Sequence, residues 1–302
     1  MERLFSALPT PFLGENCIEI DYKSLEKLID FQVKNDVEGL VFSGSTGEGH
    51  TLTKNEWCEL ITFGIKKVRE YNKKYSKTAK VVAGVGFNCT KTAVEYAKMA
   101  EKLSADYILA TVPYYNKPQQ DGIYTHFAKI ASAVKTPIIL YNVPGRTVTD
   151  MQNDTIVRLA KDFKNVVSLK DATGKLERVA ELKKLLDDAN CGNFAMLSGE
   201  DATQIGFNAM GGRGVISVVA NVAPKLCADI QNACKNGDYT TALALQNELI
   251  KLSKAMFCGP NPVPVKYALM KMGIFDSDAP REPLVKPCEK VMKVVDDAVK
   301  KL

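Results

Sequence analysis

The chain has 302 residues, of which 46% are hydrophobic and 25% charged, and its 40 basic against 35 acidic residues give a formal net charge of +5. This is an ordinary globular composition with apolar material for a large core. The basic residues are scattered rather than massed, which argues against nucleic-acid binding. With only two histidines, His50 and His126, three-histidine zinc sites and His-Glu-x-x-His chemistry are excluded.

The eight cysteines form no Cys-x-x-Cys pair and no framework spacing, so reduced thiols in a cytoplasmic compartment are the simplest interpretation. Cys227 and Cys234 have helical spacing and are expected to be buried on one helix face. Residues 1–11 lead directly into the first expected strand, without the charged and then apolar pattern of a signal peptide. No apolar run approaches the roughly 18 residues needed to span a bilayer, so no membrane association is expected.

Short apolar runs alternate with amphipathic segments along the whole chain. The runs are rich in β-branched residues, and turn-forming residues follow them. The expected strands are residues 4–8, 39–43, 80–85, 106–112, 137–142, 166–170, 194–198 and 214–218. Helices are expected over 24–33, after Thr53, and over 91–103 and 175–188. Thr53 and Glu56 have the spacing of a capping box, and Thr90 is expected to cap the helix over 91–103.

Eight strand-then-helix units favour an α/β fold that closes into a (β/α)8 TIM barrel, because an open Rossmann sheet usually has about six strands. The catalytic barrel is predicted over 1–235, followed by a C-terminal helical extension over 236–302. Within the extension, residues 261–264 (Asn-Pro-Val-Pro) are expected to form a stiff break before a helix from Val265.

In such barrels the loops after the strands form the active site. The second strand is followed by Gly44-Ser45-Thr46-Gly47-Glu48-Gly49, where hydroxyls and freed amides can hold a carboxylate or phosphate. A tight turn is an equally good interpretation of that loop, because the lysine of a phosphate-binding loop is missing. The fourth strand is followed by Tyr114 and Tyr115, which suit either a binding or subunit surface or a packed aromatic corner.

The fifth strand ends at Tyr141, and Arg146 follows in the next loop. A phenol there can relay a proton, and an arginine can bind a carboxylate with two hydrogen bonds. The alternative is a rigid loop with a packed tyrosine and a solvated arginine.

The sixth strand carries the most specific candidate for a catalytic residue, Lys170. Alternation places Val166, Ser168 and Lys170 on one face. If that face points into the barrel, desolvation favours the uncharged, nucleophilic amine of Lys170. The alternative is a lysine that reaches solvent at the strand end. Lys117 and Lys266 are competing amines, and both are expected to be solvated.

Together these motifs resemble the dihydrodipicolinate synthase family, one of the pyruvate-dependent Schiff-base aldolases and lyases, from Leu4 to the C-terminal helices. The resemblance is carried by Gly44-Ser45-Thr46-Gly47-Glu48, Pro113-Tyr114-Tyr115-Asn116, Tyr141-Asn142-Val143-Pro144-Gly145-Arg146-Thr147, Lys170-Asp171-Ala172-Thr173-Gly174 and Asn261-Pro262-Val263-Pro264-Val265-Lys266.

The resemblance implies a reaction of lysine and diaminopimelate biosynthesis. The Lys170 amine forms an imine with pyruvate, loss of a methyl proton gives an enamine, and the enamine adds to the aldehyde of L-aspartate 4-semialdehyde. The amino group of that substrate then displaces Lys170 and closes the ring of 4-hydroxy-tetrahydrodipicolinate. The family needs neither a metal nor an organic cofactor.

The resemblance also assigns the other site residues and a homotetramer built as a dimer of dimers. Tyr141 would relay protons through Thr46 and through Tyr115, which in this family reaches in from the neighbouring subunit. The substrate-binding residues would be Ser45 and Thr46 for the pyruvate carboxylate, Arg146 for the semialdehyde carboxylate, and Gly199 and Ile216 lining the pyruvate pocket.

Two positions bear on the choice within the superfamily. Ser45 stands where the synthases usually carry a second threonine, and Gly-Ser-Thr-Gly-Glu is typical of N-acetylneuraminate lyase, the alternative function. Arg146 favours the synthase, because the lyases generally lack it. An inactive barrel that serves as a binding protein is the alternative from another class, and the intact set of site residues argues against it.

The lysine-inhibited members of the family bind lysine at a subunit interface. Residues matching two of their lysine-binding positions, Asn88 and Tyr114, are present. Thr92 and Trp57 stand where those members commonly carry an acid and a histidine, which argues against strong feedback by lysine. The candidate allosteric positions are Asn88, Tyr114, Trp57 and His50.

Overall fold

The computed structural model describes residues 3–14 and 19–300 of the chain. The barrel strands are β1 (Leu4–Ala7), β4 (Gly39–Phe42), β5 (Lys80–Gly84), β6 (Tyr107–Thr111), β7 (Ile138–Asn142), β8 (Val166–Asp171), β9 (Ala195–Ser198) and β10 (Gly214–Ser217). Within the described ranges these eight parallel strands form one closed barrel, in the order β1-β10-β9-β8-β7-β6-β5-β4. Every boundary lies within one residue of the predicted run, so the predicted (β/α)8 fold is confirmed.

The chain divides into two compact units, which are described separately. The first unit contains Arg3 and Val82–Ile216, and the second contains Leu4–Val81 and Ser217–Leu302. Helix α9 (Pro224–Lys235) ends at the predicted limit of the barrel, but the compact units do not follow that limit. The division into a 1–235 barrel and a 236–302 extension therefore stays a prediction.

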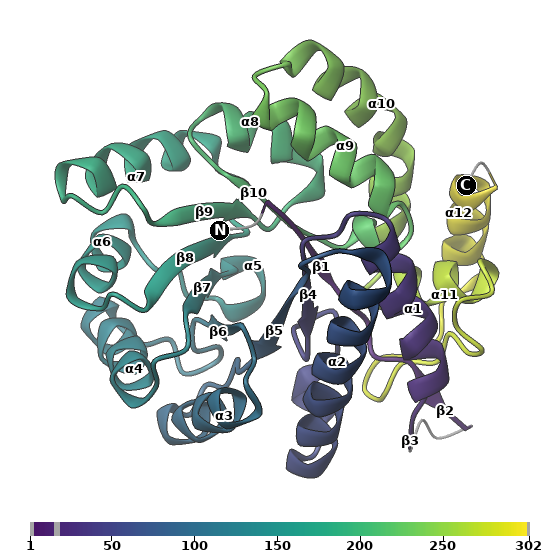
Figure 1. The fold of residues 1–302 in the computed structure, drawn as a ribbon, viewed down its shortest axis with the longest axis horizontal. Helices are drawn as coiled ribbons and strands as arrows, with labels where there is room; N and C mark the ends of the chain where they lie inside the picture. The colour runs from purple at the N-terminus through teal and green to yellow at the C-terminus, as the bar shows by residue number, and fades with distance from the viewer. Residues whose placement is uncertain (1–2, 15–18, 301–302) are drawn as a thin grey trace. The chain divides into compact units, whose positions relative to one another are not determined.

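In the first unit the strands β6 to β9 are covered by helices on their outer side. These helices are α3 (Thr90–Leu103), α4 (Gln120–Ala133), α6 (Asn153–Asp162) and α7 (Leu176–Asp188), with the short α5 (Pro144–Thr147) and α8 (Gln204–Ala209) at strand ends. Successive helices of the α3-α4-α6-α7 series pack side by side (Figure 1). Each buries one apolar stripe and exposes a charged face, as expected for helices around a parallel sheet.

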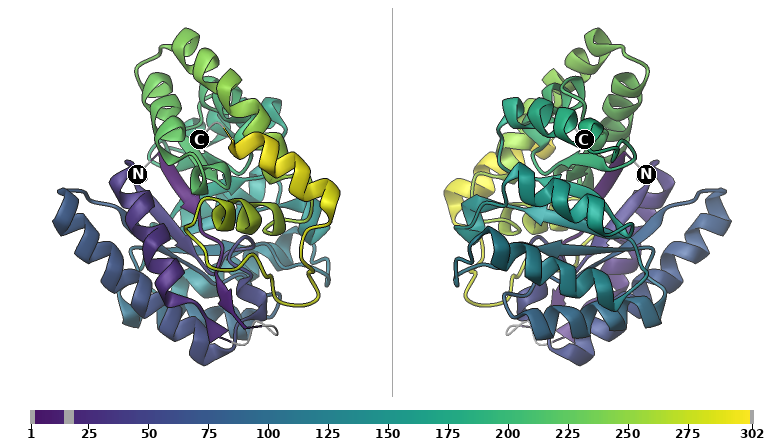
Figure 2. Two further views of the ribbon diagram at one scale, coloured as in Figure 1. Left: turned by 90° about the vertical axis from the view of Figure 1, so that its right-hand side faces the viewer. Right: turned by 90° about the vertical axis from the view of Figure 1, so that its left-hand side faces the viewer.

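The second unit combines N-terminal and C-terminal segments. Its helices are α1 (Tyr22–Lys34), α2 (Lys54–Tyr75), α9, α10 (Tyr239–Met256), α11 (Val263–Lys271) and α12 (Glu289–Val299), and a small antiparallel pair joins β2 (Phe12–Leu13) to β3 (Glu19–Ile20). Helix α1 packs on α2, α10 packs on α9, and α12 packs against both α10 and α11 (Figure 2). None of the described helices is long and apolar enough to cross a membrane.

Helix α1 begins at Tyr22, two residues before the expected start, and two further helix starts differ from the prediction. The capping box is confirmed, because the Glu56 amide donates to the Thr53 hydroxyl and the Thr53 amide donates to the Glu56 carboxylate. The prediction for Thr90 was wrong: Cys89 is the cap residue of α3, and the Thr90 hydroxyl instead lies 2.9 Å from Nδ1 of His126.

The second of these differences is the start of α11. The helix begins at Val263 rather than Val265, so Pro264 lies in its first turn. Proline is compatible with a first turn because its missing N–H has no helical partner there and its fixed φ is already helical. The burial of Cys227 and Cys234 on α9 is confirmed.

His126 is the one of the two histidines that is buried, and this gives the stability of the protein a pH dependence. Burial lowers the pKa of His126 to about 4, from an ordinary value near 6.5. As the pH falls from 6.5 towards 4, the unfolded chain binds a proton at this residue that the folded chain does not bind. The free energy of unfolding should therefore fall by about 3 kcal/mol over that window and level off below it.

Urea unfolding at several pH values checks this expectation. In His126→Gln the pH-dependent loss between pH 6.5 and 4 should be smaller by that amount, whereas His50→Gln, at an exposed position, should follow the unmodified protein. Equal slopes in the unmodified protein and His126→Gln would contradict the assignment.

Candidate active site

The candidate site of the first unit is built on the adjacent ends of β7 and β8. Tyr141 and Lys170 are register partners across these strands. Both are buried, with 5% and 6% of their surface exposed, and Nζ of Lys170 lies 4.4 Å from the centroid of the Tyr141 ring. This distance is within cation–π range. The predicted burial of Lys170 is confirmed, and the lysine does not escape to solvent at the strand end.

The next residue of each strand, Asn142 in β7 and Asp171 in β8, points to the opposite face and contacts charged side chains there. Asn142 donates to Oδ1 of Asp150 at 2.7 Å, and Arg178 of α7 donates to the same oxygen at 2.8 Å. Nε of Arg178 also lies 3.2 Å from Oδ2 of Asp171, close enough for an ion pair although it is not aligned for a hydrogen bond. One guanidinium thus ties together the ends of both strands that carry the tyrosine–lysine pair.

The end of β9 adds a carboxyl group that sequence reasoning missed. Burial and the neighbouring Asp201 raise the pKa of Glu200, while the positive charges of Lys170 and Arg146 oppose the shift. The half-buried Glu200 carboxyl therefore shares its electrostatic surroundings with both predicted cations. The signal in the sequence was its place two residues after the end of a barrel strand.

Gly199 is required by a close backbone approach at the same place. Its amide donates to the Asp171 carbonyl at 2.6 Å, and a Cβ atom at this position would lie 2.6 Å from Cβ of Ala172. A larger residue would therefore push the end of β9 away from β8. Ile216 is fully buried on β10.

The remaining predicted residues of the first unit lie in loops or in the short helix α5. Arg146 is exposed on α5. Tyr115 is 88% exposed and has a left-handed backbone with φ of 72°, so its side chain is not packed within this chain. Tyr114 is half-buried, and the carbonyl of the half-buried Asn88 accepts a hydrogen bond from Asn116 at 3.0 Å.

In the second unit, the loop after β4 carries Ser45 and Thr46. Thr46 is buried, and its hydroxyl accepts a hydrogen bond from the side-chain amide of Asn261 at 2.9 Å. The loop carbonyl of Gly47 accepts a second bond, from the hydroxyl of Thr10 at 2.7 Å. Ser45 is half-buried on the same loop.

The prediction that Lys266 is solvated was wrong. Lys266 is completely buried, and its ammonium donates to Oε1 of Glu48 at 2.6 Å. The sequence placed Lys266 on a terminal helix, where solvation was expected, and its burial depends on partners far away in the chain. Lys117 is exposed, as predicted. Of the candidate allosteric positions in this unit, Trp57 is fully buried on α2 and His50 is exposed.

A family model described as the Dihydrodipicolinate synthetase family matches residues 1–302. The chain belongs to this family. The 4-hydroxy-tetrahydrodipicolinate synthase of Bartonella bacilliformis is 44% identical over 295 residues, which cover 97% of this chain and 95% of the relative.

Two solved structures extend the comparison. The dihydrodipicolinate synthase of Aquifex aeolicus has a TM-score of 0.93 and 36% identity, with 100% of this chain and 98% of that chain covered. The chloride-inhibited dihydrodipicolinate synthase of Acinetobacter baumannii, solved in complex with pyruvate, has a TM-score of 0.90 and 39% identity, with 99% and 97% covered. The resemblance drawn from the motifs is confirmed.

The structure of this dihydrodipicolinate synthetase family member brings together Lys170 and Tyr141, and the charge of Arg146 acts on the same Glu200 as that of Lys170. Ser45 and Thr46 belong to the other compact unit, so the predicted hydrogen bond between Thr46 and Tyr141 stays a prediction. Among the described residues, no group of three or more His, Cys, Asp or Glu side chains is arranged to hold a metal ion.

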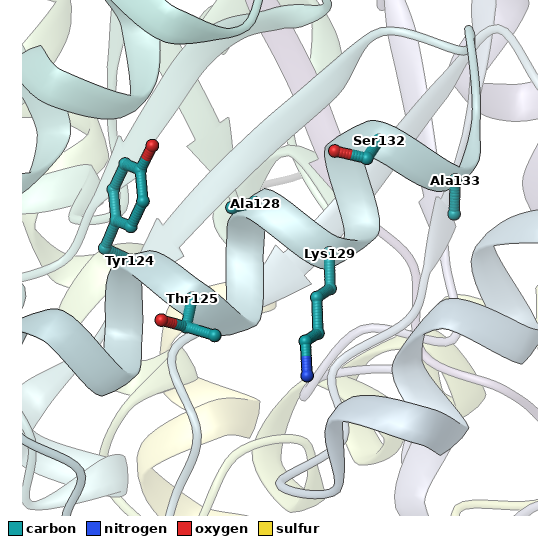
Figure 3. A pocket seen from close by; sticks show the side chains of 6 residues that line it. All are labelled: Tyr124, Thr125, Ala128, Lys129, Ser132 and Ala133. Atoms are coloured by element: carbon teal, nitrogen blue, oxygen red, sulfur yellow. The ribbon is translucent and has the colours of Figure 1, made fainter.

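A surface pocket of about 380 Å³ lies along one face of α4 in this family member (Figure 3). It is lined by Tyr124, Thr125, Ala128, Lys129, Ser132 and Ala133. None of these is a predicted site residue, and all come from a single helix. The pocket is therefore separate from the candidate active site.

Proposed function

We propose that this chain is a lyase that condenses pyruvate with L-aspartate 4-semialdehyde to 4-hydroxy-tetrahydrodipicolinate through an imine at Lys170. The observation that carries the proposal is the buried Lys170 beside Tyr141, in a chain that belongs to the dihydrodipicolinate synthetase family. Attack on a ketone requires an amine, and Lys170 holds one in a buried site beside a phenol that can move protons.

The steps balance without an added oxidant or reductant. The Lys170 nitrogen adds to the ketone carbon of pyruvate, and water leaves to give a protonated imine. This cation accepts the electron pair of a methyl C–H bond as the proton departs, which gives an enamine. The enamine carbon bonds to the aldehyde carbon of the semialdehyde, the aldehyde oxygen takes up a proton to become a hydroxyl, and the imine at Lys170 forms again. Finally the substrate amine adds to the imine carbon and expels Lys170 as a free amine.

Protons must move at several of these steps. Tyr141 is the candidate relay, because its ring lies against the Lys170 ammonium and its phenol can donate and accept a proton. Thr46 is proposed as its hydrogen-bond partner within the chain. Tyr115 is proposed as its partner from the neighbouring subunit, and the 88% exposure of Tyr115 supports a contact outside this chain.

The substrate carboxylates have separate candidate sites. Ser45 and Thr46 are proposed for that of pyruvate, with Gly199 and Ile216 lining its pocket. Arg146 is proposed for the semialdehyde carboxylate. Glu200 is a further candidate in this region, because the positive charges of Lys170 and Arg146 act on its carboxyl group.

Arg146→Met should raise the KM for the semialdehyde by roughly 10- to 100-fold, because it removes charge-assisted hydrogen bonds worth about 1.5–3 kcal/mol. Arg146→Lys should recover only part of the loss, since an ammonium lacks the two-pronged geometry of a guanidinium. Steady-state kinetics with each substrate varied would test this. Borohydride trapping of pyruvate on Lys170 should be unaffected, and an unchanged KM for the semialdehyde would refute the role.

One assay separates the candidate functions. The purified chain should turn over pyruvate with L-aspartate 4-semialdehyde and should not cleave N-acetylneuraminate. Turnover of N-acetylneuraminate alone would assign the lyase activity that the Gly-Ser-Thr-Gly-Glu loop resembles. Failure of both reactions, without any pyruvate adduct, would favour a binding protein built on an inactive barrel.

The assembly, location and regulation are also proposals. A homotetramer, built as a dimer of dimers, would complete the site with the partner's tyrosine, and sedimentation at several concentrations would measure it. A cytoplasmic location fits the reduced-thiol interpretation of the cysteines, and no cofactor is needed for the steps above. Among the candidate lysine-binding positions, Asn88 and Tyr114 are at least partly accessible, and titration of the activity with lysine would test them.

A further inference from the structure

A buried ion pair that the proposed reaction does not use lies behind the loop that follows β4. Glu48 and Lys266 are both completely buried, and Nζ of Lys266 lies 2.6 Å from Oε1 of Glu48. Lysine and glutamate are almost never fully buried without such a partner. The two residues are 218 positions apart in the chain. The pair therefore joins the loop of the barrel to helix α11 of the C-terminal segment.

The other groups around the pair also come from distant segments. The second carboxylate oxygen of Glu48 accepts a hydrogen bond from the Arg281 amide at 2.8 Å. The Arg281 guanidinium donates a hydrogen bond to the Thr51 carbonyl at 3.1 Å and forms an ion pair with Glu56. The ring of Phe12 has the Lys266 ammonium and the Arg281 guanidinium each 4.3 Å from its centroid. Each charged group of the cluster therefore has an oppositely charged or aromatic neighbour.

The backbone of the loop needs outside support. Ser43 and Glu48 have left-handed φ values of 57° and 50°, which residues with a side chain adopt only where the surroundings hold them. The chain doubles back so tightly that a Cβ atom on Gly49 would lie 2.2 Å from the Ser43 carbonyl oxygen. The ion pair holds Glu48, and so it holds one end of the strained segment that contains Ser45 and Thr46.

The same short segment of the C-terminal region touches the loop at a second point. Asn261, five residues before Lys266, donates to the Thr46 hydroxyl at 2.9 Å. A threonine hydroxyl has a single proton to donate, so one that already accepts from Asn261 has its proton free for another partner. The position of Asn261 thus sets the direction in which Thr46 donates.

We propose that Glu48 and Lys266 are positioning residues: their buried pair fixes the Ser45–Thr46 loop against the start of α11 and keeps Asn261 on the Thr46 hydroxyl. This inference rests on the proposed function, in which that loop holds the pyruvate carboxylate. It makes the C-terminal segment part of the substrate-binding apparatus rather than an addition to the barrel. Neither residue contacts substrate in this account.

The test uses the full-length chain with both charges neutralised, Glu48→Gln/Lys266→Met. Removing both partners avoids leaving a buried unpaired charge, and such replacements often preserve stability. The KM for pyruvate should rise by about 10-fold or more, because the hydrogen bonds that hold the loop are lost. At saturating pyruvate, borohydride should still trap the adduct on Lys170. Lys266→Arg, which keeps the charge, should retain most of the pyruvate affinity.

The matched control is Glu26→Gln/Lys67→Met, which neutralises an ion pair of 2.7 Å between α1 and α2 in the same unit. Its KM for pyruvate should stay within twofold of the unmodified protein, an allowance on the order of 0.4 kcal/mol. A normally folded Glu48→Gln/Lys266→Met variant with an unchanged KM would overturn the inference. If that variant does not fold, Asn261→Ala serves instead, and an unchanged KM there would equally overturn it. Absence of a pyruvate adduct in the unmodified protein would instead refute the proposed function.

Discussion

Lys170→Ala is expected to lose activity by at least about 10⁴-fold, comparable to the removal of a covalent nucleophile in other enzymes. Alanine has no amine to form the imine, so no electron sink develops for removal of the pyruvate methyl proton. Treatment of the unmodified protein with pyruvate and borohydride should add one reduced pyruvate unit to the peptide that contains Lys170. The variant should gain no such mass.

Lys117→Ala is the matched control, because Lys117 is a competing amine at an exposed position of the same compact unit. It should keep full activity and the adduct on Lys170. Peptide mapping distinguishes the two lysines directly. An adduct on another lysine in place of Lys170, or full activity of Lys170→Ala, would contradict the imine mechanism.

Arg178→Leu is expected to lower the free energy of unfolding by about 3–5 kcal/mol, because it leaves two carboxylates without their shared cation. Arg178 and Asp171 are almost completely buried, and the Arg178 guanidinium also bonds Asp150 and the Met151 carbonyl. Leucine supplies neither charge nor hydrogen bonds. Urea unfolding at neutral pH measures the loss.

Arg158→Leu is the control for this prediction. Arg158 also pairs with an aspartate, Asp121, at 3.2 Å, but both side chains are more than half exposed. Exposed pairs contribute little, so its free energy of unfolding should change by no more than about 1 kcal/mol. A similar small change in Arg178→Leu would show that the buried cluster does not stabilise the strand ends. A folded Arg178→Leu should also trap pyruvate more slowly, because Asn142 and Asp171 directly follow the two catalytic candidates in their strands.

The barrel strands could be predicted because their signals are local. Short β-branched runs bounded by turn residues appear within a few positions of one another, and this is enough to identify each strand. The same local logic placed Lys170 on one face of β8 with Val166 and Ser168, since alternate residues of a strand share a face. The structure shows that Lys170 is buried, and Tyr141 lies beside it because the two are register partners of β7 and β8.

The two errors at helix starts arise where the local pattern is compatible with more than one outcome. Thr90 has the right residue type for a cap, but its hydroxyl faces His126, which lies on the next helix along the chain. The Asn-Pro-Val-Pro segment contains prolines that a helix interior rejects, yet its last two residues, Val263 and Pro264, open α11. For Thr90, the structure shows the tertiary contact, with His126, that accompanies the different outcome.

By itself, then, the sequence determined the alternation of strands and helices, the strand face that Lys170 shares with Val166 and Ser168, and the motifs that assign the chain to its family. Only the tertiary structure showed that Lys266, which was expected to be solvated on a terminal helix, is buried against Glu48, 218 residues away. A charge can be buried only where a partner compensates its lost hydration, and that partner is chosen by chain folding rather than by neighbouring residues. For the same reason, the sequence could not predict that Arg178 is buried in an ion pair with Asp171.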